Sequence, residues 1–281
     1  MIHNKFYCIG DLGYKIALFS DIHYDKDYDI MIFTKIINNL KENNPNFICI
    51  SGDIIDYSSM IEEECIDKLK DFIKQLSLIA PTIVTLGNHD ISNRIKNKRI
   101  KGNIKAINEW FLNLNKIENV YYLYNKSIIR NELCFTSYNP PHEYYGIGQE
   151  DAKLFASNID EEINLKPSYY NILLCHSPIS VFKTEVLKKS KELKKVNLIL
   201  SGHMHNGLVF KLFDKKGNVG LISPTKTLFP KYARGLSSKM LEKKQIYLVV
   251  SGGVVKLSNT NSKLLSRFNK FYPISVDYIN I

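Results

Sequence analysis

The chain has 281 residues, of which 44% are hydrophobic and 23% are charged. This composition supplies a buried core for one large domain or two small ones, and it excludes a disordered, collagen-like or coiled-coil protein. Its apolar runs have the length of buried strands and fall short of the ~18 residues that a membrane-spanning helix needs. We expect no transmembrane segment, and because the first ten residues lack a secretory signal we expect a cytoplasmic protein.

The formal net charge of +10 suggests an anionic partner, but the basic residues are 33 lysines and only five arginines. Arginine is the residue that best recognises phosphate and guanine edges through its forked guanidinium, so the signal for nucleic acid is weak. A solvated lysine-rich surface and a real anionic partner both remain open. Such a surface could also dock peripherally on anionic lipid at the inner face of a membrane.

The cysteines are odd in number and include no Cys-x-x-Cys pair. This pattern is typical of reduced core residues in a reducing compartment. We therefore expect five buried, unpaired thiols: Cys8, Cys49, Cys65, Cys134 and Cys175.

Apolar runs and amphipathic stretches alternate along the chain. The first predicted elements are a strand over 14–20, a helix over 28–43, a strand over 46–51, a helix over 60–78 and a strand over 82–86. This βαβαβ series is typical of a layered α/β domain with a largely parallel sheet. Next come a helix over 104–114, two or three strands within 120–136, a helix over 150–163, a strand over 170–175, a helix over 183–195 and a strand over 197–201.

The last third of the sequence, from Gly207, alternates apolar and polar residues between glycines and prolines, which predicts antiparallel strands. No repeat, low-complexity tract or linker divides the chain, so we expect one domain over residues 1–281. Two loops, 137–149 and 223–239, are long enough to be binding elements or lids, although disordered insertions would look the same. Their candidate substrate-binding residues are Tyr144, Tyr145, Tyr232 and Arg234.

Residues that bind divalent metals follow each predicted core strand directly. These are Asp21 and His23, then Asp53 and Asp56, then Asn88, His89 and Asp90, then His176, and finally His203 and His205. Ligands of open α/β sheets bind beyond the carboxyl ends of the strands, so these five loops should open onto one edge. A lone histidine is more often structural, and an aspartate here could simply cap a helix. Five of the seven histidines share this placement, however, while His3 and His142 lie outside it.

The residue types suit a centre of two metal ions. Imidazole and carboxylate together favour Mn, Fe or Zn, whereas a magnesium site would use mostly oxygen ligands. A pair of metals needs a ligand that can bridge them, which a carboxylate can do and an imidazole cannot. Asp53 is the natural bridge, and manganese is our default expectation for both ions.

Five blocks of the sequence resemble the signature motifs of the calcineurin-like metallophosphoesterases. In order, they are Asp21-Ile22-His23, Gly52-Asp53-Ile54-Ile55-Asp56, Gly87-Asn88-His89-Asp90, His176 and Gly202-His203-Met204-His205. The resemblance implies a four-layer αββα sandwich with a dinuclear metal centre at its edge. It assigns one metal to Asp21, His23, Asp53 and His205, and the other to Asp53, Asn88, His176 and His203.

The same resemblance implies roles for three more residues. His89 would be the catalytic histidine, positioned by Asp90, while Asp56 would support the loop or the ligands from behind. Two cations lower the pKa of a shared water and neutralise charge on the phosphate. His89 as general acid would protonate an alkoxide leaving group.

Departures from the motifs narrow the expected function. The protein Ser/Thr phosphatase branch continues its second block with Arg and Gly and ends its third with Glu, whereas Tyr57 and Asp90 stand at those places here. Protein phosphatase activity is therefore disfavoured. A weaker resemblance to a bacterial phosphodiesterase branch, which acts on lipid-linked or nucleotide-linked phosphoesters, rests on an opening hairpin over 6–20, the segment 229–235 and a closing strand over 249–253.

Three readings of function follow from these residues. The leading one is a metal-dependent phosphodiesterase or phosphatase acting on a small or lipid-linked phosphoester. The second is a nuclease of the same superfamily, which should show a long basic groove and extra capping domains. The third is a non-catalytic interaction scaffold, which could lose its ligands without harm; here every ligand position is filled.

Overall fold

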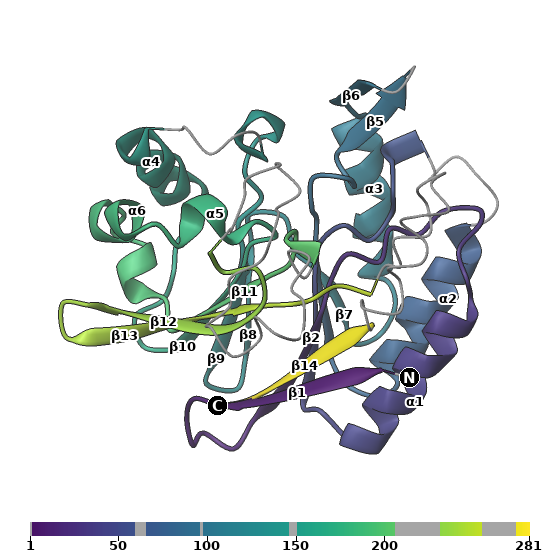
Figure 1. Ribbon diagram of the computed structural model, residues 1–281, viewed down its shortest axis with the longest axis horizontal. Helices are drawn as coiled ribbons and strands as arrows, with labels where there is room; N and C mark the ends of the chain where they lie inside the picture. Colours follow the sequence, from purple (N-terminus) through teal and green to yellow (C-terminus); the bar gives the residue numbers. More distant parts are fainter. Residues whose placement is uncertain (1, 60–65, 96–97, 146–150, 206–230, 255–273) are drawn as a thin grey trace.

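Two mixed β-sheets pack face to face, with helices on both outer surfaces (Figure 1). The computed structural model describes residues 2–59, 66–95, 98–145, 151–205, 231–254 and 274–281. The arrangement is the αββα sandwich expected from the sequence motifs, and the fold prediction is confirmed.

The first sheet consists, in spatial order, of β1 (His3–Cys8), β14 (Ser275–Asn280), β2 (Lys15–Phe19), β3 (Phe47–Ser51), β4 (Thr82–Thr85) and β7 (Val120–Tyr122). The second consists of β12 (Gly235–Leu241), β13 (Lys244–Val250), β11 (Leu198–Ser201), β10 (Tyr170–Leu174), β9 (Leu133–Ser137) and β8 (Ser127–Arg130). The outer helices are α1 (Met31–Asn43), α2 (Ile66–Ser77) and α3 (Ile104–Leu114) on the first sheet, and α4 (Ala152–Glu162), α5 (Pro178–Val181) and α6 (Thr184–Lys189) on the second.

Three hydrophobic clusters fill the spaces between these four layers. One lies between the two sheets and includes Leu18 and Leu174. A second packs α1, α2 and α3 onto the first sheet, where the Phe33 and Phe72 rings stack with their centroids 3.9 Å apart. Burial of one such side chain contributes about 1.5–3 kcal/mol, so each layer has its own driving force for assembly. The third joins the second sheet to α4 and α6.

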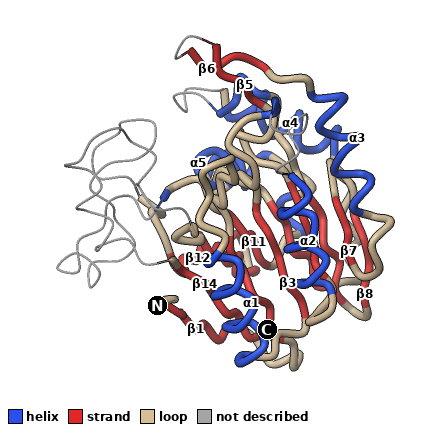
Figure 2. The backbone as a smooth tube through the Cα atoms, turned by 90° about the vertical axis from the view of Figure 1, so that its right-hand side faces the viewer, coloured by secondary structure: helices blue, strands red, loops and turns tan. Residues whose placement is uncertain are grey.

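Helix α1 shows how the sequence pattern produces one of these layers. Ile32, Ile36 and Leu40 recur every four residues and are buried, so they form one apolar stripe facing the sheet. The helix ends where Asn44 adopts a left-handed conformation with φ 46° and donates its N–H to the Leu40 carbonyl. Figure 2 shows α1 and α2 lying across the strands of the first sheet.

The opening hairpin expected over 6–20 is wrong. β14 lies between β1 and β2, pairing in parallel with β1 and antiparallel with β2. The closing strand is therefore β14, and the segment 249–253 includes the end of β13 instead. Burial explains the order, because β14 is buried at nearly every position and suits the interior of a sheet, whereas β1 is half exposed and suits an edge.

Two further differences are local. The helix expected over 183–195 breaks after α6, because the Asp160 carboxylate accepts hydrogen bonds from the Ser190 hydroxyl and the next two backbone amides. A short antiparallel hairpin, β5 (Ser92–Ile95) and β6 (Lys98–Lys101), was not expected. Residues 60–65 and 150 of the predicted helices, and 146–149 and 223–230 of the two long loops, lie outside the described residues.

The predicted burial of the cysteines holds for Cys49, Cys134 and Cys175, which are free thiols in the core. Cys8 is exposed, which corrects that expectation, because it lies at the end of the edge strand β1. Cys65 lies outside the described residues. Among the helices that the structure describes, none is both long and apolar enough to cross a membrane.

Parallel pairing brings the carboxyl ends of the core strands to one edge of the sandwich. β2, β3 and β4 run in parallel in the first sheet, and β10 and β11 do so in the second. The Ser51 hydroxyl at the end of β3 donates to the Leu200 carbonyl in β11, which links the two sheets at this edge. The loops with the metal-binding residues therefore face one another.

Candidate metal centre

Tight left-handed turns place the candidate ligands at the strand ends. Five of them have positive φ angles: Asp21 (56°), His23 (46°), Asp53 (52°), His203 (70°) and His205 (43°). Such angles are uncommon for residues with a Cβ and cluster at functional sites. Gly52, which precedes Asp53, has φ 82°, and Gly87 leaves no room for a side chain because a Cβ there would lie 2.2 Å from Asp53 Oδ1.

Asp53 lies at the centre of the cluster. Its Oδ2 lies 3.0 Å from His176 Nε2 and 3.6 Å from His23 Nε2, which come from different sheets. Its Oδ1 accepts the backbone N–H of His89 at 2.8 Å. The Asp53 carboxylate thus faces ligands of both expected metals, and the loop after β4, which contains His89, holds its orientation.

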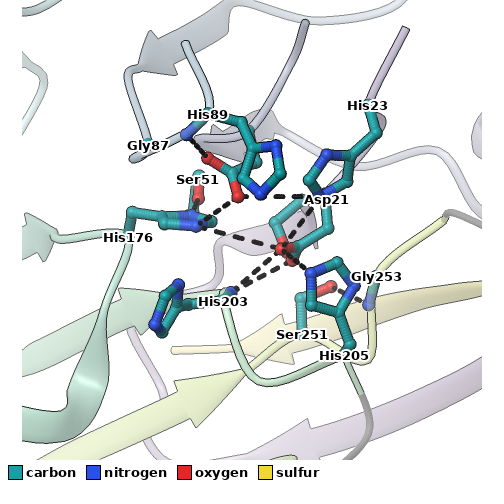
Figure 3. A network of polar contacts seen from close by, with 12 residues as sticks. Asp21, His23, Ser51, Gly87, His89, His176, His203, His205, Ser251 and Gly253 are labelled. Carbon is teal, nitrogen blue, oxygen red and sulfur yellow. Dashed lines mark hydrogen bonds and ion pairs between the residues drawn. The ribbon is translucent and has the colours of Figure 1, made fainter. Parts of the chain in front are cut away.

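Asp21 connects the first and last loops. Both of its oxygens lie 3.1 Å from the backbone nitrogen of His203, which donates to them, and Ser20 donates its hydroxyl to Oδ2. Oδ1 also lies 3.5 Å from His205 Nε2 (Figure 3). The backbone N–H of Asp21 donates to the Gly52 carbonyl, so the loop after β3 also supports Asp21.

Three sets of side chains have the proximity that metal coordination requires, and one of them, His23, Asp56 and His89, includes the candidate catalytic histidine. The other two correspond to the two expected metals. The first ligand group is Asp21, His23, Asp53 and His205, and the second ligand group contains Asp53, His176 and His203. In each group the potential ligand atoms lie within 4.8 Å of one another, and Asp53 belongs to both. These side chains are the ones that the sequence motifs assign to the two metals, apart from the amide Asn88, which neither group contains.

Unpartnered polar atoms test whether metals fit this cluster. Buried nitrogen and oxygen atoms are almost always hydrogen-bonded, because leaving one unsatisfied costs about 1–3 kcal/mol. Five buried atoms here lack an ordinary hydrogen-bond partner: His23 Nε2, Asp53 Oδ2, Asn88 Oδ1, His176 Nε2 and His203 Nε2. Two of them, Asp53 Oδ2 and His176 Nε2, lie 3.0 Å apart and form an ion pair when the histidine is protonated. Each is the atom type that would donate electrons to a cation. The donor set of imidazole, carboxylate and amide oxygen fits a pair of transition-metal ions.

Hydrogen bonds and charges tune the histidines for ligation. The Nδ1 of His176 lies 2.6 Å from the Ser51 carbonyl, to which it donates, so Nε2 is the nitrogen that faces the site and can bind a metal once its proton is lost. Burial opposes a charge on His176, but the neighbouring Asp53 carboxylate prevails and raises its pKa to about 9. Burial lowers the pKa of His203 to about 3 and that of His205 to about 4, so both are neutral at pH 7.

Asp56 joins the candidate catalytic histidine to a candidate ligand. Its Oδ1 lies 3.0 Å from His89 Nδ1 and 3.2 Å from His23 Nδ1, and the two rings meet edge to face with centroids 4.2 Å apart. The sequence motifs predict that Asp90 positions His89 and that Asp56 supports the loop or its ligands, and the contact of Asp56 with His23 agrees with the second of these. In the structure, however, Asp56 and not Asp90 contacts the His89 ring.

Asp90 has a different set of partners. Its Oδ1 accepts the backbone N–H groups of Ile54 and Ile55, both at 2.9 Å, and its Oδ2 accepts that of Gly87 at 2.7 Å. Burial and the nearby Asp53 charge raise the pKa of Asp90 to about 7. The carboxyl group thus clamps together the loop after β3, which contains Ile54 and Ile55, and the loop after β4, which contains Gly87.

A model of the calcineurin-like phosphoesterase family matches residues 14–207, which contain every residue of both ligand groups. The chain belongs to this family. Among similar proteins, a Campylobacter jejuni metallophosphoesterase is 29% identical over 70% of this chain and 45% of its own length. A Helicobacter pylori metallophosphoesterase is 24% identical over 71% of this chain and 46% of its own. The chain thus spans about half the length of these curated relatives.

A third relative has a named activity. It is the UDP-2,3-diacylglucosamine pyrophosphatase of Chlamydia muridarum, which is 24% identical over 84% of this chain and 77% of its own length. That alignment covers a larger share of this chain than the alignments with the first two relatives do.

The four candidate substrate residues of this phosphoesterase-family chain are not gathered at one place. Tyr145 borders the second ligand group, with its ring centroid 6.3 Å from that of His176 and 6.0 Å from that of His203. Tyr144 packs instead on Phe155, and Tyr232 on Phe182, in the cluster beneath α4 and α5. Arg234 is buried directly before the start of β12.

Sequence reasoning missed several residues that support the site. A serine stands at or just past the carboxyl end of four core strands, directly before or within the functional loops: Ser20, Ser51, Ser201 and Ser251. All four are buried, and three of them donate to Asp21 or to a backbone carbonyl. Because a serine recurs at the end of these strands, the sequence pattern could have indicated that it supports the site. Tyr57 lies with its ring centroid 5.9 Å from that of His89, a contact that no motif indicates.

Proposed function

We propose that this chain is a metal-dependent phosphoesterase that hydrolyses a small or lipid-linked phosphoester at a dinuclear centre. The observation that supports this most directly is a set of five buried donor atoms without an ordinary hydrogen-bond partner, four of which belong to the two ligand groups that share Asp53. A scaffold protein would have no reason to maintain buried atoms without partners, because each of them lowers its stability. Membership of the phosphoesterase family supports the same chemistry.

The residues present would hold two ions in distinct ways. Asp21, His23, Asp53 and His205 would hold one ion, and Asp53, Asn88, His176 and His203 the other. When bound, such ions supply a nucleophilic water near neutral pH and neutralise charge on the phosphate. Manganese, iron and zinc all fit this donor set, and manganese is the ion to test first.

His89 would act on the leaving group. Its side chain is 15% exposed, so it can reach a substrate, while its Nδ1 is held by Asp56. The contact with Asp56 favours a protonated imidazole, which can donate its Nε2 proton to the departing oxygen. Alkoxides are poor leaving groups and need that proton, whereas aryloxides need it far less.

The deciding experiment measures hydrolysis of an aryl phosphodiester and the matching aryl monoester with Mn²⁺, Fe²⁺, Zn²⁺ or no metal. We expect metal-dependent turnover in the wild type and none in Asp53→Ala, because that change removes the shared carboxylate. Replacement of the exposed His3 by alanine is the matched control and should leave turnover unchanged. Full metal-dependent activity in Asp53→Ala would overturn the proposed site.

A companion assay tests the role of His89 and the nuclease alternative. His89→Ala should slow cleavage of an alkyl ester by about 10²- to 10⁴-fold and slow cleavage of an aryl ester much less. Equal losses on both esters would contradict its role as general acid. Single- and double-stranded DNA are included as substrates, because efficient cleavage of either would favour the nuclease reading.

A further inference from the structure

Tyr57 follows directly after Asp56, the residue whose carboxylate contacts the His89 ring. The Tyr57 ring lies beside that of His89, with the centroids 5.9 Å apart and the ring planes tilted by 36°. Rings at roughly 4.5–7 Å are close enough to attract each other. Neither the ligand groups nor the protonation of a leaving group requires this tyrosine, so its place beside the candidate catalytic histidine needs a separate explanation.

Contacts on both sides of Tyr57 fix its position. The carbonyl oxygen of Asp56, which belongs to the peptide bond that precedes Tyr57, lies 3.0 Å from His89 Nδ1. Ser58, the next residue, is buried and packs so closely on Gly102 that a Cβ there would overlap the Ser58 hydroxyl. The backbone is therefore held before and after Tyr57, and binding of a substrate does not have to order it.

The histidines of the second ligand group have almost no exposed surface. His176 is fully buried, and His203 is 4% exposed. The Tyr145 ring also lies beside both of them, with centroid distances of 6.3 Å to His176 and 6.0 Å to His203. A substrate therefore does not approach the centre past these two histidines.

More surface is exposed around His89. Its side chain is 15% exposed and that of His205 is 28% exposed, while Tyr57 is half-buried beside His89. Figure 3 shows the His89 ring on the opposite side of the cluster from the His203 ring. Tyr57 thus borders the exposed part of the site that contains the candidate general acid.

The role of His89 determines what lies next to Tyr57 when a substrate is bound. A leaving oxygen must come within hydrogen-bond reach of the His89 ring to take its proton, so the carbon group on that oxygen lies beside the same ring. His23 also contacts His89, but it is a candidate metal ligand and meets the ring edge to face. Tyr57 offers an uncharged, rigid ring at this place, and such a ring attracts another flat ring beyond the effect of burial alone.

We propose that Tyr57 is a specificity residue that contacts the leaving group and favours alcohols with a planar ring one or two carbons from the ester oxygen. The proposal rests on the proposed function, because His89 is what places the leaving oxygen. It narrows the substrate class to phosphoesters with a ring-bearing leaving group. Long saturated chains are disfavoured on the leaving side, since they cannot stack on the tyrosine.

The test compares 2-phenylethyl and 2-cyclohexylethyl esters in the metal-loaded protein. Monoesters or symmetrical diesters are used, whichever the aryl assay shows to be hydrolysed. The two alcohols have similar size and acidity, so His89 assists both alike and the difference measures the ring contact. The wild type should hydrolyse the phenylethyl ester with a kcat/KM about two- to tenfold higher, as expected for one aromatic pair. The gain should appear in KM, because the contact exists before and during bond cleavage.

Three variants locate the source of this preference. Tyr57→Leu keeps an apolar side chain but removes the ring, and it should bring the ratio of the two kcat/KM values close to one. Tyr57→Phe keeps the ring and should retain the preference. Tyr121→Leu is the matched control, because Tyr121 is a half-buried tyrosine in β7 that pairs with Ile83, four residues before Gly87. It should retain the wild-type ratio.

Several outcomes would overturn the proposed role of Tyr57. These are equal kcat/KM values for the two esters in the wild type, a preference that survives in Tyr57→Leu, or a preference that is lost in Tyr121→Leu as well. A purely structural role gives a different result: if Tyr57 only supported His89, Tyr57→Leu would lower kcat on both esters by the same factor and leave their ratio unchanged. Thermal unfolding of each variant verifies that it is folded.

The proposed function can fail without deciding the role of Tyr57. If the wild type hydrolyses no ester, calorimetric titration of the metal-loaded protein with 2-phenylethyl phosphate and 2-cyclohexylethyl phosphate measures the ring contact directly. Binding of the phenylethyl compound that is about two- to tenfold tighter, and is equalised in Tyr57→Leu, would support the contact. Equal binding of the two compounds by the wild type would overturn it.

Discussion

Asp56 and His89 are joined by a contact of 3.0 Å between Oδ1 of the aspartate and Nδ1 of the histidine. Burial alone would raise the pKa of Asp56, but hydrogen bonds from two histidines lower it well below the usual value. The carboxylate is therefore ionised at every pH at which the protein works, and it stabilises a protonated His89.

Asp56→Asn should slow alkyl ester hydrolysis by about 10- to 100-fold, as is typical for partners that orient functional side chains. The neutral amide keeps the shape but weakens the support of the imidazolium, so the pKa of His89 should fall. The rate of alkyl ester hydrolysis should then begin to decline at a lower pH than in the wild type, because His89 loses its proton earlier. Asp27→Asn, an exposed aspartate in the loop after β2, is the control. An unchanged profile would contradict the coupling of Asp56 to His89.

Asp90→Ala should weaken metal binding by at least about tenfold while the rings of the site remain in place. The change leaves three backbone amides, those of Ile54, Ile55 and Gly87, without their acceptor, at about 1–3 kcal/mol each if they stay buried. Asp90→Asn retains one carbonyl oxygen and should recover part of the loss. Metal titration followed by tryptophan fluorescence or calorimetry measures both, and equal behaviour of wild type and Asp90→Ala would refute the clamp.

Gly87→Ala should abolish metal binding, because the added Cβ would lie 2.2 Å from Asp53 Oδ1 and 2.5 Å from its backbone nitrogen. Gly13→Ala is the matched control: Gly13 has φ 85°, but no heavy atom lies within 4 Å of the position that its Cβ would take. That control should cost about 1 kcal/mol of folding stability through backbone strain and leave metal affinity unchanged. If both variants bound metal equally, the close approach of Gly87 to Asp53 would not matter.

Metal binding at pH 7 should release about one proton from His176. Without metal the pKa of His176 is about 9, because the Asp53 carboxylate outweighs the opposing effect of burial, so its Nε2 is protonated at pH 7. A cation must displace that proton, and affinity should fall as the pH falls. Calorimetric titration in buffers of different ionisation enthalpy counts the protons. Release of none would show that His176 is already neutral or does not bind the metal.

Asp277 should make the fold less stable as the pH rises from about 4 to about 7. Burial raises the pKa of this carboxyl group to about 7, so between these values the folded state binds more protons than the unfolded state does. Because the folded state binds more protons, the free energy of unfolding decreases as the pH increases. Asp277→Asn should reduce this dependence to the part that comes from Asp90, whose pKa is also raised to about 7, and urea unfolding at about pH 5 and about pH 7.5 measures it. An unchanged pH dependence in the variant would exclude Asp277 as its source.

The sequence by itself predicted the layered α/β fold and the residues that gather at the sheet edge. It could do so because neighbouring parallel strands end at the same edge of a sheet, and because the helices and the strands each show a clear hydrophobic periodicity. Asp53 could be chosen as the shared residue for a chemical reason, since only a carboxylate bridges two ions. The structure places it between His23 and His176, from opposite sheets.

Only the tertiary structure decided how these residues contact one another. Asp56 and Asp90 are each the last residue of a motif, yet one contacts the His89 ring and the other accepts from three backbone amides. Likewise, β14 enters between β1 and β2 from the far end of the chain. Sequence patterns determine which face of an element is apolar. How the layers pack decides where side chains point in the left-handed turns and which strands pair between the two ends of the chain. A local sequence pattern carries no information about this packing.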